Sequence, residues 1–112
     1  MQSSARLRHL RIAPRKVRIV ADLVRGQNIG KALAVLRFTP KAAAKPVEKL
    51  LRSAIANAED LSKGQVDVDR LVVETIYVDQ GPTLRRYLSR AMGRATRVNK
   101  KTSHVTVVLS DR

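Results

Sequence analysis

The sequence contains no cysteine and very few aromatic residues, and both absences narrow what the chain can be. Without cysteine there is no disulfide framework and no thiolate metal site. The aromatic residues are Phe38, Tyr77 and Tyr87 alone. Proteins that bind single-stranded nucleic acid usually stack bases on several aromatic rings, so we do not expect stacking to dominate here. We expect Phe38 and Tyr77 in the core, whereas Tyr87, among arginines, can stack on a base or pack on its neighbours.

Long apolar segments are also missing. No stretch approaches the roughly 20 residues of a transmembrane helix, and the N-terminus lacks the apolar segment of a signal peptide. We therefore expect a cytoplasmic chain without a membrane partner. Its 112 residues, of which 44% are hydrophobic, fit one folded domain with a single core.

Acidic residues are scarce relative to basic ones. The sequence has 9 Asp and Glu against 23 Lys and Arg, a formal net charge of +14. Such an excess repels itself and disfavours a compact state unless a polyanion neutralises it. Nucleic acid is the commonest polyanion in a cell, and binding to it releases counterions. The composition thus predicts nucleic-acid binding that weakens steeply with salt.

The basic charge is concentrated towards the two ends of the chain. Residues 1–25 contain seven basic side chains and only Asp22 as an acid, whereas residues 26–78 are nearly balanced, with eight basic and six acidic side chains. Residues 83–101 contain seven basic side chains and no acid. An ordinary solvated surface mixes the two signs, so these two segments are the candidate binding surfaces.

Hydrophobic periodicity predicts a small α+β domain. Residues 5–8 alternate as in a strand, and residues 71–78 and 104–109 are rich in β-branched residues, as strands are. Pro14 suits the first turn of a helix that ends near Gly26, and Asn28 can cap a second helix that ends at Thr39. A third helix spans residues 47–58, and an i,i+4 pair is expected between Arg18 and Asp22. We predict a small antiparallel sheet packed by three helices.

Residues 79–103, between the last two strands, admit two structures. Leu84, Leu88, Ala91 and Ala95 recur at helical spacing, which favours an arginine-rich helix. The alternative is a long hairpin whose arms continue the strands. In either form the segment has too few large apolar residues to fold alone, so we expect it to project and to gain order from its partner.

Catalytic and metal-binding patterns are weak. His9 and His104 could form an acid–base pair for RNA cleavage, but no other catalytic group accompanies them, and a hydrogen-bonding or phosphate-contacting role is the better interpretation. The acidic residues match no calcium loop, and the glycines form no phosphate-binding motif. We expect neither an enzyme nor a bound metal or cofactor. An architectural DNA-binding protein shares the charge argument, but no groove-entering element or half-site geometry is apparent.

Three stretches of the sequence resemble a known family. They are IAPRKVRIVADLVRG (Ile12 to Gly26), SAIANAE (Ser53 to Glu59) and VDQGPTLRRYLSRAMGRATRVNKKTSHVTVVLSD (Val78 to Asp111). Together they resemble the bacterial form of the universal large-subunit ribosomal protein twenty-two, in the same order and over nearly the whole chain. The chain departs from that family at Ala13, where a serine cap is common, and at Ser89, where proline is frequent.

The resemblance implies a structural role in the large ribosomal subunit. It implies a single domain (1–112) with a globular body of residues 1–78 and 104–112 and an extended hairpin of residues 79–103, so it favours the hairpin over the helix. Its implied partners are large-subunit ribosomal RNA, neighbouring ribosomal proteins and, at the hairpin tip, the nascent polypeptide, with support for assembly and no homo-oligomer. The tip that would line the peptide exit tunnel comprises Leu88, Ser89, Arg90, Ala91, Met92 and Gly93. The expected RNA-binding residues are Arg6, Arg8, Arg11, Arg15, Lys16, Arg18, Arg85, Arg86, Arg90, Arg94, Arg97, Lys100, Lys101, Thr102 and His104.

Overall fold

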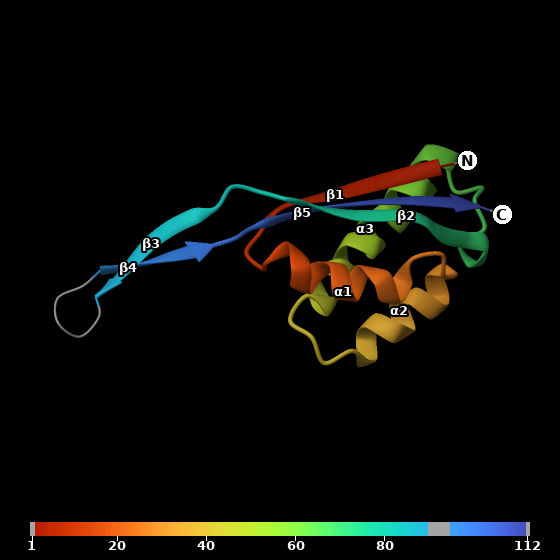
Figure 1. The fold of residues 1–112 in the computed structure, drawn as a ribbon. Helices are drawn as coiled ribbons and strands as arrows, with labels where there is room; N and C mark the ends of the chain where they lie inside the picture. The colour runs from red at the N-terminus through yellow and green to blue at the C-terminus, as the bar shows by residue number, and fades with distance from the viewer. Residues whose placement is uncertain (1, 90–94, 112) are drawn as a thin grey trace.

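A three-stranded antiparallel sheet forms one layer of the body. The computed structural model describes the main chain of residues 2–89 and 95–111 and the side chains of residues 2–83 and 100–111. Strands β1 (Gln2–Leu10), β5 (Ser103–Asp111) and β2 (Leu71–Gln80) lie in that order, so the C-terminal strand is central (Figure 1). The register places Arg6 opposite Thr106, and Thr106 opposite Tyr77. The two strands predicted from β-branched residues are therefore confirmed.

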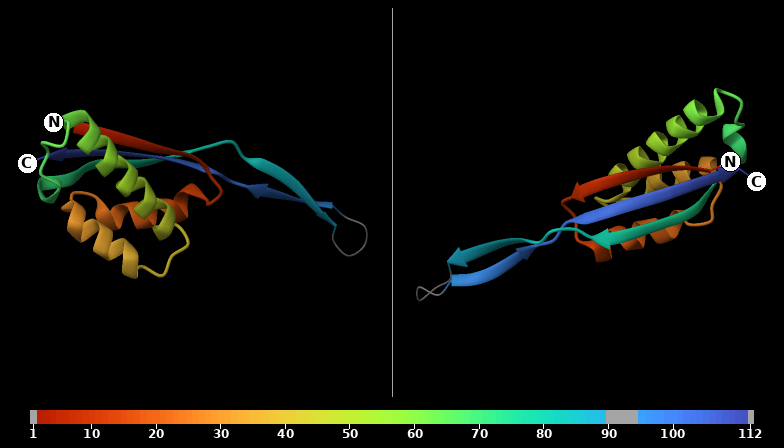
Figure 2. Two further views of the ribbon diagram at one scale, coloured as in Figure 1. Left: turned by 180° about the vertical axis from the view of Figure 1, so that it is seen from behind. Right: turned by 90° about the horizontal axis from the view of Figure 1, so that it is seen from above.

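Three helices cover one face of this sheet (Figure 2). They are α1 (Pro14–Val24), α2 (Ile29–Phe38) and α3 (Ala44–Ser62). Alternate residues of β5 turn towards them, and Val105, Val107 and Leu109 are fully buried. Each fully buried aliphatic side chain of this size stabilises the fold by about 1.5–3 kcal/mol relative to exposure. The predicted α+β fold with a helix-covered sheet is thus confirmed. No helix in the described part of the chain is both long and apolar enough to cross a bilayer.

The helix boundaries follow local sequence signals. Asn28 caps α2 as predicted, because its side-chain oxygen accepts a hydrogen bond from the Gly30 N–H at 2.9 Å. Ala13 precedes α1 and offers no side-chain cap. Helix α3 begins at Ala44, so Pro46 lies in the first turn, where its missing N–H costs no hydrogen bond. Lys63 ends α3 in the left-handed region, with φ 55°.

Residues 84–89 and 95–100 form the two arms of a hairpin, not a helix. Strand β3 (Leu84–Ser89) pairs antiparallel with β4 (Ala95–Lys100), from Leu84 opposite Lys100 to Ser89 opposite Ala95. The hairpin projects from the body along the longest dimension of the molecule, whose principal extents are 65 × 25 × 16 Å (Figure 1). The helical alternative is therefore wrong for the described part of the segment, and residues 90–94 lie outside the described residues. The segment has helical spacing, but its arms extend the antiparallel pairing of β2 and β5.

Two aromatic residues predicted in the core lie on the surface. Phe38 is 83% exposed, because it is the last residue of α2 and lies beyond the buried positions Ala32 and Leu36. Tyr77 is 41% exposed, because its buried neighbours Ile76 and Val78 take the helix-covered face of β2. Both predictions were wrong, since residue type alone does not specify which face a side chain occupies.

Candidate nucleic-acid interface

The turn from β1 into α1 presents a group of exposed cations. Arg6 and Arg8 lie on β1, Arg11 lies in the turn, and Arg15 and Lys16 lie in the first turn of α1; all five are exposed. None of them forms a side-chain hydrogen bond or an ion pair with any residue that the structure describes. Five cations along β1 and its junction with α1, none with a partner among the described residues, favour an external anion.

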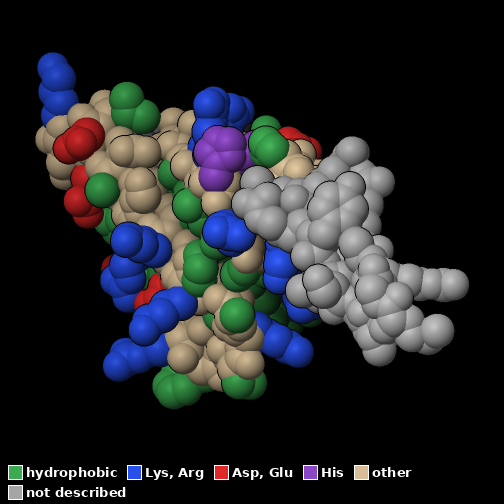
Figure 3. Space-filling model, turned by 90° about the vertical axis from the view of Figure 1, so that its left-hand side faces the viewer, with side chains coloured by type: hydrophobic (Ala, Val, Ile, Leu, Met, Phe, Trp, Pro, Cys, Tyr) green, Lys and Arg blue, Asp and Glu red, His purple; other side chains and the backbone are tan. Residues whose placement is uncertain are grey.

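A basic recess lies where the hairpin joins the body. Its volume is about 440 Å³, and four cations line it together with Ile12, Ala13 and Ala42. The four cations are Arg11, Lys16, Lys100 and Lys101. No carboxylate lines the recess, and the first turn of α1 carries no acidic residue that would offset the positive end of the helix dipole. Lys and Arg side chains lie on several sides of the hairpin base (Figure 3).

Arg18 and Arg25 contact the protein's own main chain. Arg18 Nη2 donates to the Val78 carbonyl at 3.0 Å, and Arg25 Nη2 donates to the Ile76 carbonyl at 2.9 Å. Asp22 pairs with Arg25, three residues further along the helix. The predicted Arg18–Asp22 pair is therefore wrong, because Arg18 reaches the outer edge of β2 instead. Part of the hydrogen-bonding capacity of Arg18 is used inside the protein.

Hydrogen bonds between residues distant in sequence hold the neck of the hairpin, which comprises residues 81–83 and 101–103. Gly81 N–H donates to the Thr102 carbonyl at 2.9 Å, and the Thr102 hydroxyl donates to the Pro82 carbonyl at 2.6 Å. Thr102 is 5% exposed, so its hydroxyl, expected to contact RNA, is engaged within the neck. Ser103 Oγ donates to the Ile12 carbonyl at 2.5 Å and joins β5 to the β1–α1 turn. The neck and the basic recess are thus parts of one connected structure.

The two histidines meet beside the neck. The His9 N–H donates to His104 Nδ1 at 3.1 Å, and the two rings lie edge to face with centroids 4.9 Å apart. His9 has φ 58° and lies where the pairing of β1 with β5 shifts between Leu7 and Leu10. His104 therefore supports a strained bulge in β1 through an acceptor nitrogen. This contact fits the predicted hydrogen-bonding role, and the described residues hold no cluster that could bind a metal.

The hairpin arms place basic residues on both strands. Arg85 and Arg86 lie on β3, and Arg97 and Lys100 lie on β4. In the register, Arg97 is opposite Tyr87, and Lys100 is opposite Leu84. Leu88 and Ser89, predicted as tip residues, form the end of β3. The remaining predicted contacts lie outside the described residues; they are Arg90, Ala91, Met92, Gly93 and Arg94.

One basic surface was not singled out from the sequence. Lys45 and Lys49 project from the first turns of α3 and line one recess together with Arg6 of β1. Residues 26–78 are nearly balanced in charge, so composition gave no reason to select them. The signal in the sequence is their spacing of four, which places both lysines on one side of the helix.

Comparison with known proteins gives the family. The family model described as ribosomal protein L22p/L17e matches residues 5–110. The large ribosomal subunit protein uL22 of Myxococcus xanthus (strain DK1622) is 63% identical over 111 residues, covering 99% of this chain and 97% of that protein. The protein of the same name from Anaeromyxobacter sp. (strain K) is 66% identical over 105 residues, covering 94% of this chain and 71% of that protein. The chain therefore belongs to the ribosomal protein L22p/L17e family, and the resemblance of its three sequence stretches to that family is confirmed.

Proposed function

We propose that the chain binds large-subunit ribosomal RNA through the basic end of its body and both arms of its hairpin, and that the hairpin tip lines the nascent-peptide exit tunnel. As a member of its family, it is a structural, non-enzymatic protein of the ribosome in the cytoplasm. The proposal concerns which of its surfaces bind RNA and how this binding supports assembly of the subunit.

The basic recess carries this proposal. Arg11 and Lys16 come from the body, and Lys100 and Lys101 come from the returning arm of the hairpin. Cations from two parts of the chain therefore converge where the hairpin emerges. A phosphate there would be neutralised from both sides, and the basic residues of β3 and β4 continue the charge outwards. We infer that the protein acts as an electrostatic clamp between crowded RNA segments.

The proposed partners beyond RNA rest on the resemblance to the family, and the shape of the molecule is consistent with them. The body carries a core of its own, and the narrow hairpin extends away from it. We propose that the body contacts neighbouring ribosomal proteins, that the tip contacts the nascent polypeptide, and that one copy acts without a homo-oligomer.

The salt dependence of RNA binding tests the clamp. We expect Lys16→Gln to reduce the slope of log affinity against log salt by about one unit, because one phosphate contact is lost. The matched control is Lys31→Gln, which removes an exposed lysine from the first turn of α2, at the other end of the body. The probe is a transcript of large-subunit ribosomal RNA, with duplex DNA as competitor. Equal slopes for both variants, or stronger binding to DNA, would contradict the proposal.

Photocrosslinking on translating ribosomes tests the tunnel role. We expect Met92→benzoylphenylalanine to crosslink to the nascent chain of a stalled ribosome, because the tip would lie within reach of the peptide. The matched control carries the same photoreactive residue at Phe38, which is exposed on the body. Absence of nascent-chain crosslinks at Met92, or equal crosslinking from Phe38, would count against a tunnel position for the tip.

A further inference from the structure

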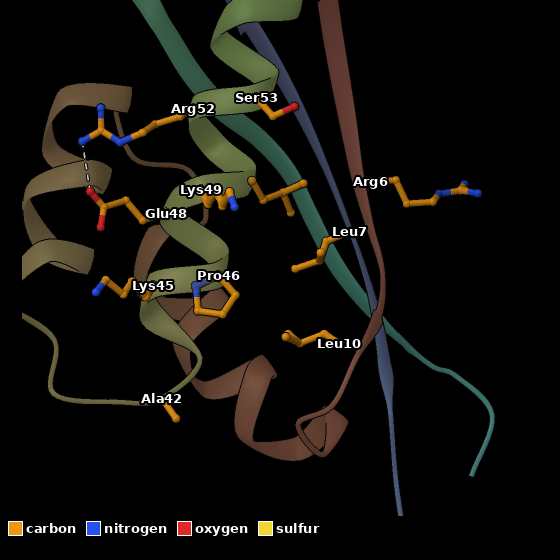
Figure 4. A pocket seen from close by; sticks show the side chains of 11 residues that line it. Arg6, Leu7, Leu10, Ala42, Lys45, Pro46, Glu48, Lys49, Arg52 and Ser53 are labelled. Carbon is orange, nitrogen blue, oxygen red and sulfur yellow. Dashed lines mark hydrogen bonds and ion pairs between the residues drawn. The ribbon is translucent and has the colours of Figure 1, made fainter. Parts of the chain in front are cut away.

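A second recess lies between the outer edge of β1 and the first half of α3, and we call it the β1–α3 groove. Its volume is about 940 Å³, within the range of pockets that hold small organic molecules. Leu7 and Leu10 of β1 face Pro46 of α3 across it (Figure 4). Both leucines are partly buried and pack against the core of the body. The floor of the groove is therefore apolar.

The groove exists because the two edges of the sheet are covered differently. The edge of β2 is closed by Arg18, by Arg25 and by the main chain that follows α1. There the Gly26 N–H donates to the Val73 carbonyl, and the Val73 N–H donates to the Gln27 carbonyl, both at 2.9 Å. Among the described residues, hydrogen bonds tie β1 to α3 only at the start of the strand, where Ser3 Oγ donates to the Ala54 carbonyl at 3.1 Å and Asn57 Nδ2 donates to the Ser4 carbonyl at 2.9 Å. Beyond these contacts the helix and the strand diverge (Figure 4), so one end of the β1 edge is left uncovered.

The rim of the groove is cationic. Arg6, Lys45 and Lys49 line it and form no side-chain hydrogen bond or ion pair with any described residue. Glu48 is the one carboxylate among the lining residues, and Arg52 Nη2 donates to it at 3.0 Å. The cations at the rim therefore have no partner among the described residues, and Figure 4 shows the Arg6 and Lys45 side chains pointing outwards from the apolar floor.

We propose that the β1–α3 groove binds one unpaired nucleotide of RNA. The base would lie on the floor formed by Leu7, Leu10 and Pro46, and the flanking phosphates would meet Arg6, Lys45 and Lys49. A paired duplex presents mainly phosphates, because its bases are stacked inside, whereas an unpaired nucleotide brings an apolar face and an anion together. This inference rests on the proposed function and extends it to α3, a helix outside the predicted interface.

Continuity of charge favours RNA over an acidic peptide. Arg6 at the groove is followed along β1 and the adjoining turn by Arg8 and Arg11, and Arg11 lines the recess at the hairpin base. One RNA segment could therefore contact both recesses. An acidic peptide bound in the groove would account for the cations of the groove alone. It would leave the cations that continue along β1 unexplained.

The first test compares two RNA stems that differ by a single bulged uridine. We expect the full-length protein to bind the bulged stem about tenfold more tightly, which corresponds to about 1.4 kcal/mol. The double variant Lys45→Gln/Lys49→Gln should lose that preference. The matched control Lys31→Gln/Arg37→Gln removes two exposed cations from α2 and should keep it. If the wild-type protein bound neither stem, the proposed function would be rejected as well. If it bound both stems equally, this inference alone would be rejected.

A second test uses assembled large subunits, so it does not depend on the stability of a charge variant. Leu10 is replaced by photoreactive leucine, which is nearly isosteric, and the subunits are irradiated. We expect mass spectrometry to find residue 10 joined to a ribosomal RNA nucleotide. A crosslink to a neighbouring protein segment, or none to RNA, would overturn the proposal.

Discussion

At the scale of single residues, Gly81 has the least space for a side chain among the glycines that the structure describes. A Cβ atom built there would lie 2.6 Å from Thr102 Oγ1 and 3.0 Å from His104 Cε1. Thr102 Oγ1 cannot withdraw freely, because it donates to the Pro82 carbonyl. The absence of a side chain at Gly81 is therefore what lets the two arms of the neck approach each other.

We predict that Gly81→Ala destabilises the protein by about 1–3 kcal/mol, the usual cost of overpacking a well-filled site. The measurement is urea unfolding of the full-length protein. The control is Gly30→Ala in α2, where the nearest atom to an added Cβ is Asn28 Oδ1 at 3.4 Å. That change should be neutral or stabilise by up to about 1 kcal/mol, because alanine favours helix. Unfolding midpoints that fall equally for both variants would disprove the steric explanation.

Single residues also show where prediction from sequence succeeds. Asn28 was predicted as a cap from its type and position alone, because capping depends on the next two residues. Phe38 and Tyr77 were misplaced, because burial depends on elements distant in sequence. The partner of Arg18 was missed for the same reason, since Val78 lies 60 residues away.

At the scale of elements, α1 begins without a side-chain cap. Ala13 has φ −59° and ψ 139°, the extended conformation that capping residues adopt. A serine at this position could accept a hydrogen bond from a main-chain N–H of the first turn. The helix therefore lacks an interaction that its backbone already accommodates.

We predict that Ala13→Ser raises the free energy of unfolding by about 0.5–1 kcal/mol, because it supplies the missing acceptor. Thermal unfolding followed by circular dichroism measures the change. Ala56→Ser makes the same chemical change at an exposed interior position of α3, and it should destabilise by a few tenths of a kcal/mol, because serine is a weaker helix former. If both variants shift the melting temperature in the same direction, capping is not the cause.

Elements differ in how well sequence predicts them. Helix α3 and strand β5 were predicted correctly, because each buries one apolar face against the rest of the chain. That burial produces the hydrophobic periodicity from which the element type is predicted. The hairpin was not decided by periodicity, and the resemblance was needed to choose it over a helix. The β1–α3 groove has no sequence signature, because it arises between Leu10 and Pro46, which meet only in the fold.

At the scale of the whole molecule, mass is distributed unevenly. The radius of gyration is 17.1 Å, against about 13 Å for a compact domain of this length. Every residue of the described core belongs to the body, in α1, α2, α3, β2, β5 and the Ala43 turn. The hairpin therefore lengthens the molecule while the body supplies its described core.

We predict that the body folds without the hairpin. Replacing residues 82–101 by Asn-Gly keeps the Gly81–Thr102 hydrogen bond and closes the strands with a two-residue turn. The free energy of unfolding should remain within about 1 kcal/mol of the wild-type value, and the urea m-value within about 10%, because every described core residue lies in the body. The salt slope of RNA binding should fall by several units, because the hairpin cations are gone.

That deletion also separates two interpretations of the hairpin. A broad, non-cooperative unfolding transition would mean that the body needs the hairpin to fold, and the division into body and extension would be wrong. An unchanged salt slope would mean that the body alone makes the phosphate contacts. The unfolding transition of this variant tests the division into body and hairpin. The salt slope of its RNA binding tests whether the hairpin cations contact phosphates.

The pairing of Gln2 with Ser110 has a consequence for how the chain can be extended. Both strand ends lie at the end of the body opposite the hairpin (Figure 1), so residues joined to either terminus would start far from β3 and β4. A fluorescent protein or an affinity handle fused at either end should therefore leave RNA docking intact.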